Sequence, residues 1–351
     1  MEKIVRKHLA AGESLVSVFG EGKEPGVFHL GLTPADSLAN ARRALSQAIS
    51  ELCPSQLVYH NGYGLAWELD KPYRKCLYLH TDYPKLESWL TPLRQHMDGC
   101  FCVNGRLEDK IRKMENAPPV WTLPHGIMPA GGQAPQNKLH APLVIGYAGR
   151  VETEQKRLDR LPEFLRELDG RAIPYRMELL GEGSYLETLK SQCEDNSHVV
   201  FHGHLTGDPY WSIIENWKYV LFLSDYEGLP LALLEAVSKG AVPIYPDFHA
   251  GDDWVSGLHG DLLYPIGDCR QAVARLARIE SHWEASDWES YRDAAANRIS
   301  RHTEQAYWES YHKLTADLPS RGGEGRSSPW RRLAQVLPLW VFHRLDTRRR
   351  T

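Results

Sequence analysis

From about residue 143 onward, short apolar runs alternate with amphipathic stretches in a regular order. The apolar runs are LVIGYAG, YRMELLG, HVVFHG, KYVLFLS and AVPIY, starting at residues 143, 175, 198, 218 and 241. The helix-like stretches between them cover residues 157–168, 184–193, 208–216 and 229–239. Buried strands that alternate with helices indicate βα units and a parallel sheet. The pattern therefore predicts an α/β domain whose ligands bind where the strands end.

The first 125 residues show a second pattern of the same kind. Apolar runs cover residues 15–20, 26–32, 56–60, 75–80 and 99–105, and helix-like stretches cover 36–52, 86–97 and 106–115. The chain opens with a helix-like segment, Glu2–Ala11, so we expect this domain to lack its first strand and the glycine-rich loop after it. Residues 124–142 contain four prolines and three glycines, which predicts a hinge between two α/β domains.

Composition narrows the class of protein further. The 351 residues suffice for two domains, and the formal net charge of −4 argues against a nucleic-acid-binding chain. The six cysteines show no CxxC pair and no metal-ligand spacing, which favours a reducing cytoplasm. Neither a signal peptide nor a run of the ~20 apolar residues of a membrane span is visible.

The charge is unevenly distributed along the chain. Residues 321–351 contain eight arginines and two acidic residues, so the remainder carries a net charge of −10. Within residues 326–351, basic ends flank an apolar, tryptophan-bearing middle, a pattern typical of an interfacial helix on anionic lipid. The alternative is a terminal helix that packs on protein, and Pro338 argues against one continuous helix.

The most informative motif is SDYEGLPLALLEAVSKG, in which Glu227 and Glu235 stand eight residues apart. Pro230 suits the first turn of a helix and Gly240 suits its end, so we expect a helix over 229–239. Its amino end follows an apolar strand and is a natural phosphate site. The alternative interpretation makes Glu235 a salt-bridged helix residue and Glu227 a cap.

Two further stretches are candidates for ligand contact. Arg150 and Lys156 follow a predicted strand in GYAGRVETEQK, and two cations at a strand's end suit a diphosphate. Gly181, Gly183 and Gly203, in LLGEGSY and VVFHG, would let the backbone approach a ligand closely. The alternatives are solvated surface charge and ordinary turn chemistry.

These stretches, in this order and spacing, resemble the C-terminal half of glycosyltransferase family 4, the retaining GT-B enzymes also called glycosyl transferases group 1. The resemblance covers residues 143–268, including GLHGDLLYPIGD, and continues more loosely to RHTEQAYWESYHKL. In the N-terminal half, QLVYHNGYG, CLYLHTDYP, GCFCVNGRLEDKI and TLPHGI resemble the family's strand ends more weakly.

The resemblance implies the GT-B fold, two Rossmann-like domains that face a cleft, with a role for each matching residue. Arg150 and Lys156 match the basic pair that neutralises the donor diphosphate. Glu235 matches the acid that binds the nucleotide ribose, and Glu227 the acid that contacts donor-sugar hydroxyls. Backbone amides near the phosphates would come from Gly228, Leu229 and Leu231.

One histidine of the N-terminal half also acquires a role from this resemblance. His80 matches a histidine near the reacting carbon, and its alternative is a hydrogen-bonded core histidine. His60 matches less well, and for it we favour the core interpretation. With these residues, the expected catalytic set is His80, Arg150, Lys156 and Glu227.

The sequence therefore predicts a retaining glycosyltransferase that takes a nucleotide-diphosphate sugar and a glycan or lipid-linked acceptor. It would act in polysaccharide, lipopolysaccharide or glycolipid synthesis, in the cytoplasm or at the inner membrane face. The chain contains no D-x-D, so we expect neither a metal nor a cofactor. Open alternatives are a sugar-nucleotide hydrolase or epimerase, and a truncated or non-catalytic scaffold. We expect four segments: an acceptor-side domain (residues 1–138), a donor domain (139–300), a closing helix (301–320) and the basic tail (321–351).

Overall fold

The structure is a computed structural model that describes most of the chain. It describes residues 15–19, 27–32, 36–52, 55–60, 73–82, 84, 86–91, 94, 97–127, 135–248 and 253–319. The expected N-terminal helix, the centre of the expected linker and the basic tail lie outside these ranges.

The chain divides into two compact units. The N-terminal unit comprises the described residues up to Thr122 together with those from Leu314, and the C-terminal unit is Leu123–Lys313. The domain limits expected from the sequence stay predictions.

The N-terminal unit contains a four-stranded parallel sheet in the order β3-β4-β5-β6. Its strands are β3 (Gln56–His60), β4 (Arg74–Leu79), β5 (Gly99–Cys102) and β6 (Val120–Thr122). The first three were expected, whereas β6 was not, because three residues are too short to show a pattern. Their carboxyl ends share one edge of the sheet, which is where His60 and the residues after β4 lie.

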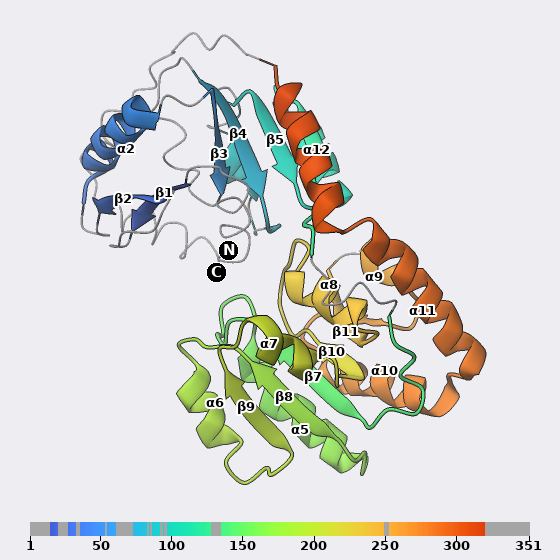
Figure 1. The fold of residues 1–351 in the computed structure, drawn as a ribbon. Coiled ribbons are helices and arrows are strands. Elements are labelled where there is room, and N and C mark those ends of the chain that lie inside the picture. Colours follow the sequence, from blue (N-terminus) through green and yellow to red (C-terminus); the bar gives the residue numbers. More distant parts are fainter. Residues whose placement is uncertain are drawn as a thin grey trace. The chain divides into compact units, whose positions relative to one another are not determined.

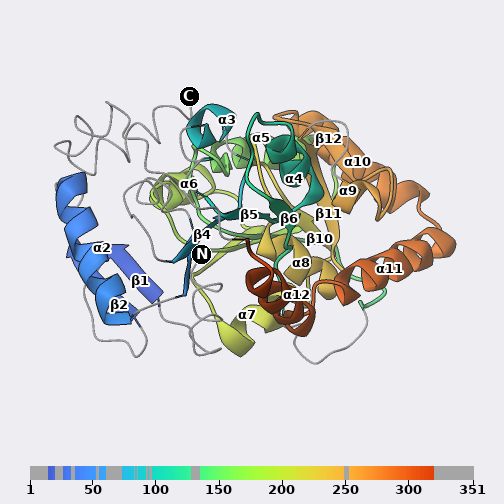
Figure 2. The same cartoon turned by 90° about the horizontal axis from the view of Figure 1, so that it is seen from above.

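Two other expected strands of this unit form a separate pair. β1 (Leu15–Phe19) and β2 (Val27–Leu32) run parallel in a two-stranded sheet, and α2 (Leu38–Leu52) packs against β2 (Figures 1 and 2). The sequence predicted both strands but not that they pair with each other. Apolar runs predict strands, and they leave the pairing partners undetermined.

The shorter helices of the N-terminal unit follow local sequence signals. α3 (Leu86–Leu90) ends well before the expected limit at residue 97, because Pro92 follows and disfavours helix in the residue before it. α4 (Gly105–Arg112) begins where the Asn104 side chain accepts a 2.8 Å hydrogen bond from the Leu107 amide.

The C-terminal unit is built on a six-stranded parallel sheet in the order β12-β11-β10-β7-β8-β9 (Figure 1). The strands are β7 (Val144–Ala148), β8 (Arg176–Leu180), β9 (Val199–Gly203), β10 (Tyr219–Leu221), β11 (Val242–Asp247) and β12 (Leu263–Pro265). This is the doubly wound order in which the first and fourth strands of the unit are neighbours. The five strands expected from the sequence are present, and β12 is added at the edge.

Helices cover this sheet and continue into the closing segment. They are η4 (Leu158–Arg160), α5 (Leu161–Gly170), α6 (Leu186–Gln192), α7 (Gly207–Ile214), α8 (Leu231–Ser238), α9 (Asp253–Ser256), α10 (Cys269–His282), α11 (Ala285–Ser300) and α12 (Glu304–Ala316). After α12 the chain returns to the N-terminal unit, where Arg74 donates to the carbonyl of Leu318 at 2.9 Å.

Close packing explains one glycine inside a central strand. A Cβ on Gly146 of β7 would lie 1.8 Å from the ring of Trp217, which is fully buried. The indole N–H of Trp217 in turn donates to the Glu178 carboxylate at 3.1 Å. The sheet therefore packs directly on a buried aromatic ring at this point.

The ends of the expected linker pack within the C-terminal unit. Ile127 exchanges backbone hydrogen bonds with the segment before α12, donating to His302 at 2.7 Å and accepting from Glu304 at 3.1 Å. Lys138 is buried and donates to the Glu215 carbonyl at 2.5 Å, and burial lowers its pKa. These described parts of the linker are therefore anchored.

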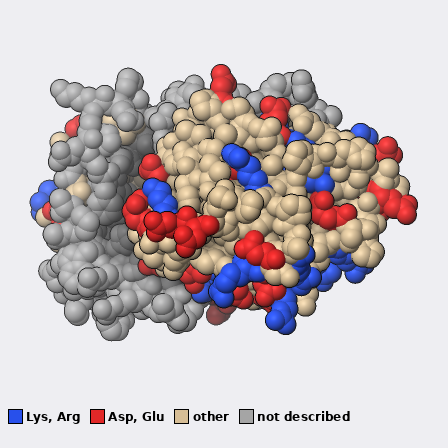
Figure 3. Space-filling view, turned by 90° about the horizontal axis from the view of Figure 1, so that it is seen from below, with Lys and Arg blue, Asp and Glu red and all other residues tan. Residues whose placement is uncertain are grey.

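Two features of the described residues concern possible partners, namely the charge of one face and the length and hydrophobicity of the helices. On the face drawn in Figure 3, Asp and Glu side chains lie beside Lys and Arg side chains, and neither sign covers the face. A polyanion-binding face would carry a continuous basic stripe. In the ranges that the structure describes, no helix is long and apolar enough to cross a membrane.

Candidate functional site

The strand order brings two loops together at one edge of the C-terminal sheet. β7 and β10 are neighbours, and the sheet reverses its winding direction between them. The loop after β7 contains Arg150 and Lys156, and the loop after β10 contains Glu227. At such a reversal the helices leave on opposite faces, so the two loops separate and create room for a ligand. The predicted site residues thus lie at the usual binding position of an open α/β sheet.

A buried ion pair joins these two loops. Lys156 Nζ lies 2.6 Å from Glu227 Oε1, with side-chain exposures of 17% and 5%. Ser224 donates to the same oxygen at 2.6 Å. The sequence placed both residues near one ligand, and the structure shows them in direct contact, 71 positions apart in the chain.

Gln155 extends this network to the second oxygen of Glu227. Its amide nitrogen lies 3.3 Å from Glu227 Oε2 and donates to the Tyr226 carbonyl at 3.1 Å. Its amide oxygen accepts from Arg150 Nη2 at 2.8 Å. Gln155 therefore connects the predicted diphosphate-binding arginine with the predicted sugar-binding glutamate.

Arg150 is the exposed member of the group. Its other guanidinium nitrogen pairs with Glu152 at 2.5 Å, and 59% of the side chain is exposed. Its carbonyl accepts a 2.6 Å hydrogen bond from the hydroxyl of Tyr147, whose pKa burial raises well above the usual range. The backbone at Arg150 is thus held by a buried phenol, while the charged end of Arg150 reaches solvent.

A second set of ion pairs fixes the loop after β7. Arg157 adopts a left-handed conformation, with φ of 53°, and pairs with Asp225 at 2.8 Å. Arg160 pairs with the same carboxylate at 2.6 Å and donates to the Leu223 carbonyl at 2.8 Å. The carboxylate of Asp225 therefore holds two cations of one loop against the other loop.

Two of the predicted glycines have a packing role. A Cβ on Gly181, where φ is +142°, would lie 1.8 Å from the Gly149 carbonyl oxygen. A Cβ on Gly183 would lie 2.2 Å from the carbonyl oxygen of Val151. Both glycines let the loop after β8 press on the loop before Lys156. At Gly203, φ is +69° and no atom lies within 4 Å of the position that a Cβ would take. Glycine is therefore favoured there by the backbone conformation and not by packing. Contact of these glycines with a donor stays a prediction.

The second glutamate of the motif lies inside α8. Glu235 is 4% exposed and accepts a hydrogen bond from the hydroxyl of Tyr210 on α7. Burial, and to a smaller extent the negative charge of Glu235, raises the pKa of Tyr210 well above the usual range. The phenol therefore keeps its proton and donates this hydrogen bond. Glu235 is thus a buried residue of α8, and both the ribose-binding role and the alternative of a salt-bridged helix residue stay predictions.

The helix itself begins later than the sequence predicts. α8 starts at Leu231, and Pro230, whose backbone is extended, is the N-cap. The Pro230 carbonyl accepts a 3.1 Å hydrogen bond from the Leu233 amide. Gly240 follows the helix with φ of +86°, as expected for a glycine at a helix end. Gly228 and Leu229 are buried before the helix, and phosphate binding by the amides of Gly228, Leu229 and Leu231 stays a prediction.

The N-terminal unit has its own group of side chains at a strand end. His60 Nδ1 and His80 Nε2 lie 2.9 Å apart, and the two rings stack with centroids 5.0 Å apart. Tyr78 also packs against His80, at 4.3 Å between centroids. His80 is thus a buried, hydrogen-bonded histidine, and its role near a reacting carbon stays a prediction. His60 contacts it directly, which the weaker match had not suggested.

Sequence reasoning missed several members of the C-terminal site. Gln155, Ser224, Asp225 and Tyr210 each contact a predicted residue or bind its loop. Ser224 and Asp225 lie inside the predicted motif and Gln155 precedes Lys156, so proximity was an available signal. Tyr210 offered none, because its contact with Glu235 depends on how α7 packs beside α8.

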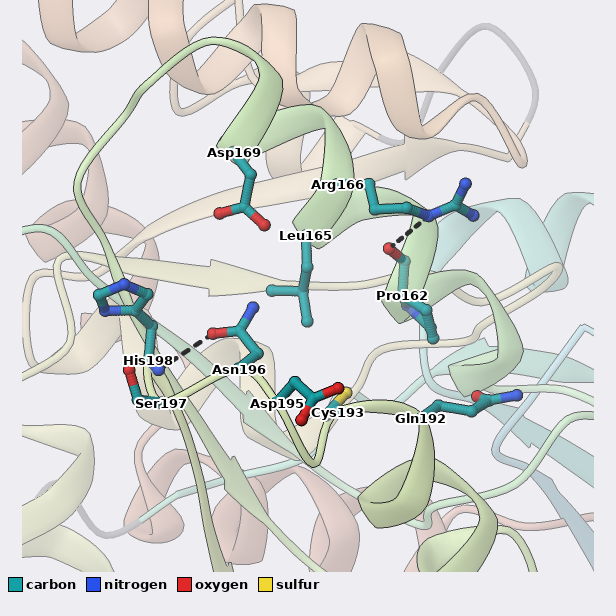
Figure 4. A pocket seen from close by; sticks show the side chains of 10 residues that line it. All are labelled: Pro162, Leu165, Arg166, Asp169, Gln192, Cys193, Asp195, Asn196, Ser197 and His198. Atoms are coloured by element: carbon teal, nitrogen blue, oxygen red, sulfur yellow. Dashed lines mark hydrogen bonds between the residues drawn. The ribbon is translucent and has the colours of Figure 1, made fainter.

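A separate hollow lies toward the amino ends of β8 and β9, away from these loops. It has a volume of about 430 Å³ and lies between α5 and the segment from the end of α6 into β9 (Figure 4). Its lining residues are Pro162, Leu165, Arg166, Asp169, Gln192, Cys193, Asp195, Asn196, Ser197 and His198. None of them is a predicted site residue, and parallel α/β sheets bind ligands at the opposite edge.

Two Rossmann-like α/β units with parallel sheets define the GT-B class of glycosyltransferase folds. Within the C-terminal unit, residues 142–281 match the family model described as Glycosyl transferases group 1. The match covers part of the chain, and it contains every predicted donor-site residue. The resemblance stated from the motifs is thereby confirmed for this part of the chain.

A curated relative matches over a similar stretch. The chain is 30% identical over 150 residues to the lipopolysaccharide 1,6-galactosyltransferase of Salmonella typhimurium strain LT2. The match covers 40% of this chain and 40% of the relative. The matched region of the chain therefore corresponds to about two fifths of the length of this relative.

Solved structures extend the likeness to most of the chain. A sucrose-phosphate synthase from Thermosynechococcus elongatus aligns with a TM-score of 0.69 and 14% identity, covering 90% of this chain and 92% of that one. The lipopolysaccharide outer core galactosyltransferase WaaB, in its apo form, aligns with a TM-score of 0.58 and 18% identity, covering 80% of each chain. At these identities the alignments establish the fold, and they confirm the expected fold class.

Proposed function

We propose that this chain is a retaining glycosyltransferase that transfers a sugar from a nucleotide-diphosphate sugar to a glycan or lipid-linked acceptor. The acceptor class follows the matched relative, whose name is lipopolysaccharide 1,6-galactosyltransferase. The observation that carries the proposal is the Lys156–Glu227 pair at the reversal point of the C-terminal sheet, inside the matched family segment.

The chemistry of donor cleavage suits this group of residues. When a nucleotide sugar loses its sugar, negative charge develops on the departing diphosphate. Fixed cations nearby stabilise that charge, and removing one such group typically costs about 3–4 kcal/mol of transition-state stabilisation. Arg150 and Lys156 would meet the diphosphate, with α8 presenting its amino end beside them.

The two glutamates would bind the neutral ends of the donor. Glu227 would accept from sugar hydroxyls, and Glu235 from the ribose. Because Glu227 holds Lys156 through one oxygen in the structure, an arriving diphosphate would share or replace that contact. His80 of the N-terminal unit would act near the reacting carbon.

We propose that this reaction requires no metal ion, since the two cations supply the positive charge. Turnover should therefore be unchanged in excess EDTA. Loss of turnover in EDTA with recovery in magnesium would contradict this part of the proposal.

We also propose a cytoplasmic location, with residues 326–351 attaching the protein to an anionic membrane surface. Replacing Arg348, Arg349 and Arg350 with glutamine should reduce partitioning onto vesicles of anionic lipid, by about 1 kcal/mol per charge near the surface. Equal partitioning of wild type and variant would contradict the attachment.

A transfer assay tests the function directly. The protein is incubated with a panel of UDP- and GDP-sugars and a lipopolysaccharide-type acceptor, and the product linkage is analysed by NMR. We expect one donor to be consumed with retention of anomeric configuration. Inverted product would contradict the retaining mechanism. Sugar release to water alone would favour a hydrolase, and no reaction with any donor would favour a non-catalytic scaffold.

A further inference from the structure

We propose that Gln155 is a positioning residue that holds Arg150 and Glu227 in one arrangement, so that the diphosphate and sugar ends of the donor site act together. This inference rests on the proposed function. The observation behind it is that one buried amide, 8% exposed, contacts both side chains.

The bridge uses both ends of the amide. The oxygen of Gln155 accepts from the Arg150 guanidinium at 2.8 Å, and the nitrogen lies 3.3 Å from the Glu227 carboxylate. A guanidinium only donates and a carboxylate only accepts, so the connecting side chain must do both. Glutamine meets this requirement without adding a charge. A glutamate here would accept from Arg150 but would repel Glu227.

The contact also determines how the Glu227 carboxylate is oriented. One of its oxygens receives Lys156 and Ser224, each at 2.6 Å, and the other receives Gln155. Donors on both oxygens restrict rotation of the carboxylate. Without Gln155 the carboxylate would turn more freely, and its lone pairs would no longer be held toward one direction.

The loop that carries Gln155 is also held by contacts that do not involve this side chain, besides the hydrogen bond that its amide donates to the Tyr226 carbonyl. The Gln155 carbonyl accepts from the Asp225 amide at 3.0 Å, and Asp225 also pairs with Arg157 and Arg160. A substitution that preserves the volume of the side chain should therefore leave the loop in place. Its effect should appear in the orientation of Arg150 and Glu227.

A double-mutant cycle tests the proposal. Binding of UDP, GDP and ADP is measured by calorimetry in wild type, Gln155→Met, Arg150→Ala and the double variant. For the nucleotide that wild type binds, Gln155→Met should raise Kd about five- to twentyfold, as expected for loss of hydrogen bonds to charged groups. In the Arg150→Ala background the same change should have less than about a twofold effect on nucleotide binding, because Arg150 is gone and the remaining partner, Glu227, is proposed to bind the sugar, which these nucleotides lack.

Two further measurements separate positioning from damage. Gln192→Met, an exposed glutamine on α6, is the matched control and should bind as wild type. The midpoint of thermal unfolding of Gln155→Met should lie within a few degrees of that of wild type. If the methionine variant does not fold, Gln155→Asn, whose shorter amide cannot bridge, replaces it in the cycle.

The outcomes distinguish this inference from the proposed function. An unchanged Kd in a folded Gln155 variant, or an equal loss with and without Arg150, would overturn the positioning role alone. Failure of wild type to bind any of the three nucleotides would overturn the proposed function and this inference together.

Discussion

The two units place different chemistry at the ends of their strands. In the C-terminal unit, Lys156 and Glu227 are a buried ion pair 2.6 Å apart, held by neutral donors around them. In the N-terminal unit, His60 and His80 form a 2.9 Å contact between two imidazole rings. A hydrogen bond between imidazoles needs one nitrogen with a proton and one without, so both rings cannot carry full charge.

This difference suggests how the work would be divided. Fixed charges suit the C-terminal unit to a diphosphate, whose negative charge grows during donor cleavage. Imidazole rings, which can both donate and accept hydrogen bonds, suit the N-terminal unit to hydroxyl groups of a sugar or an acceptor. The predictions below test this division, beginning with the largest expected effect.

Removing the lysine should have the largest effect on turnover. Lys156→Met should lower turnover about 100- to 1000-fold, because the developing diphosphate charge loses a fixed cation. The variant also leaves Glu227 buried without its cation, which should destabilise the fold by about 3 kcal/mol. The double variant with Glu227→Gln should recover most of that stability without recovering turnover. Steady-state kinetics and denaturant unfolding measure both. Near-normal turnover in Lys156→Met would contradict the charge-based role.

A pair of glycines tests whether the loops of the C-terminal unit are held by packing. Gly181→Ala would place a methyl group 1.8 Å from the Gly149 carbonyl, so it should destabilise the unit by about 3 kcal/mol or more. Gly203→Ala meets no atom and should cost only the left-handed backbone, about 1 kcal/mol. Denaturant midpoints compare the two variants. Equal losses would mean that backbone conformation, not loop contact, dominates at both positions.

The N-terminal histidine should affect transfer but not nucleotide binding. His80→Ala should reduce kcat about 100-fold, at the lower end of the range for groups that assist proton transfer. The Kd for a nucleoside diphosphate should change less than about twofold, since the proposed diphosphate contacts belong to the other unit. His198→Ala, at the distant hollow, is the control. A large loss of nucleotide affinity in His80→Ala would break the proposed division between the units.

The smallest effect concerns alkaline pH. Burial raises the pKa of Tyr147, Tyr210, Tyr219, Tyr264 and Tyr291 in the C-terminal unit well above the usual value. Below about pH 10 these phenols are protonated in both folded and unfolded chains, so their contribution is present in full. Above that pH the unfolded chain releases protons first, and stability falls as pH rises toward the folded pKa values. Hydrogen-exchange protection factors, which correct for the faster base-catalysed intrinsic exchange at high pH, should be lower in the C-terminal unit at pH 10.5 than at pH 9. Unchanged protection factors would contradict the burial of these rings.

The sequence allowed the secondary structure of the C-terminal unit to be predicted for a physical reason. Its central strands are apolar on both faces, and Gly240 marks the end of α8 with φ of +86°. The contacts between loops of different strands were harder to predict. That Lys156 meets Glu227 depends on β7 and β10 being neighbours, and apolar runs do not specify strand order.

The N-terminal unit was less predictable because its signals are weaker. β6 spans three residues, α3 only five, and β1 with β2 forms a pair of its own. Short elements offer too few positions to show a period. The contacts of Gln155 and Tyr210 could not be predicted either, because each depends on which side chain lies across a packed interface, although the place of Gln155 beside Lys156 indicated that it lies near the site.

The proposed donor site can be tested by calorimetric titration of the full chain with UDP, GDP, ADP and CMP. We expect one nucleoside diphosphate to bind without added metal, and Arg150→Ala to weaken its binding about tenfold or more, as for a lost charge-assisted contact. Binding of none of the four, or equal binding by wild type and Arg150→Ala, would contradict a donor site at the reversal point of the C-terminal sheet.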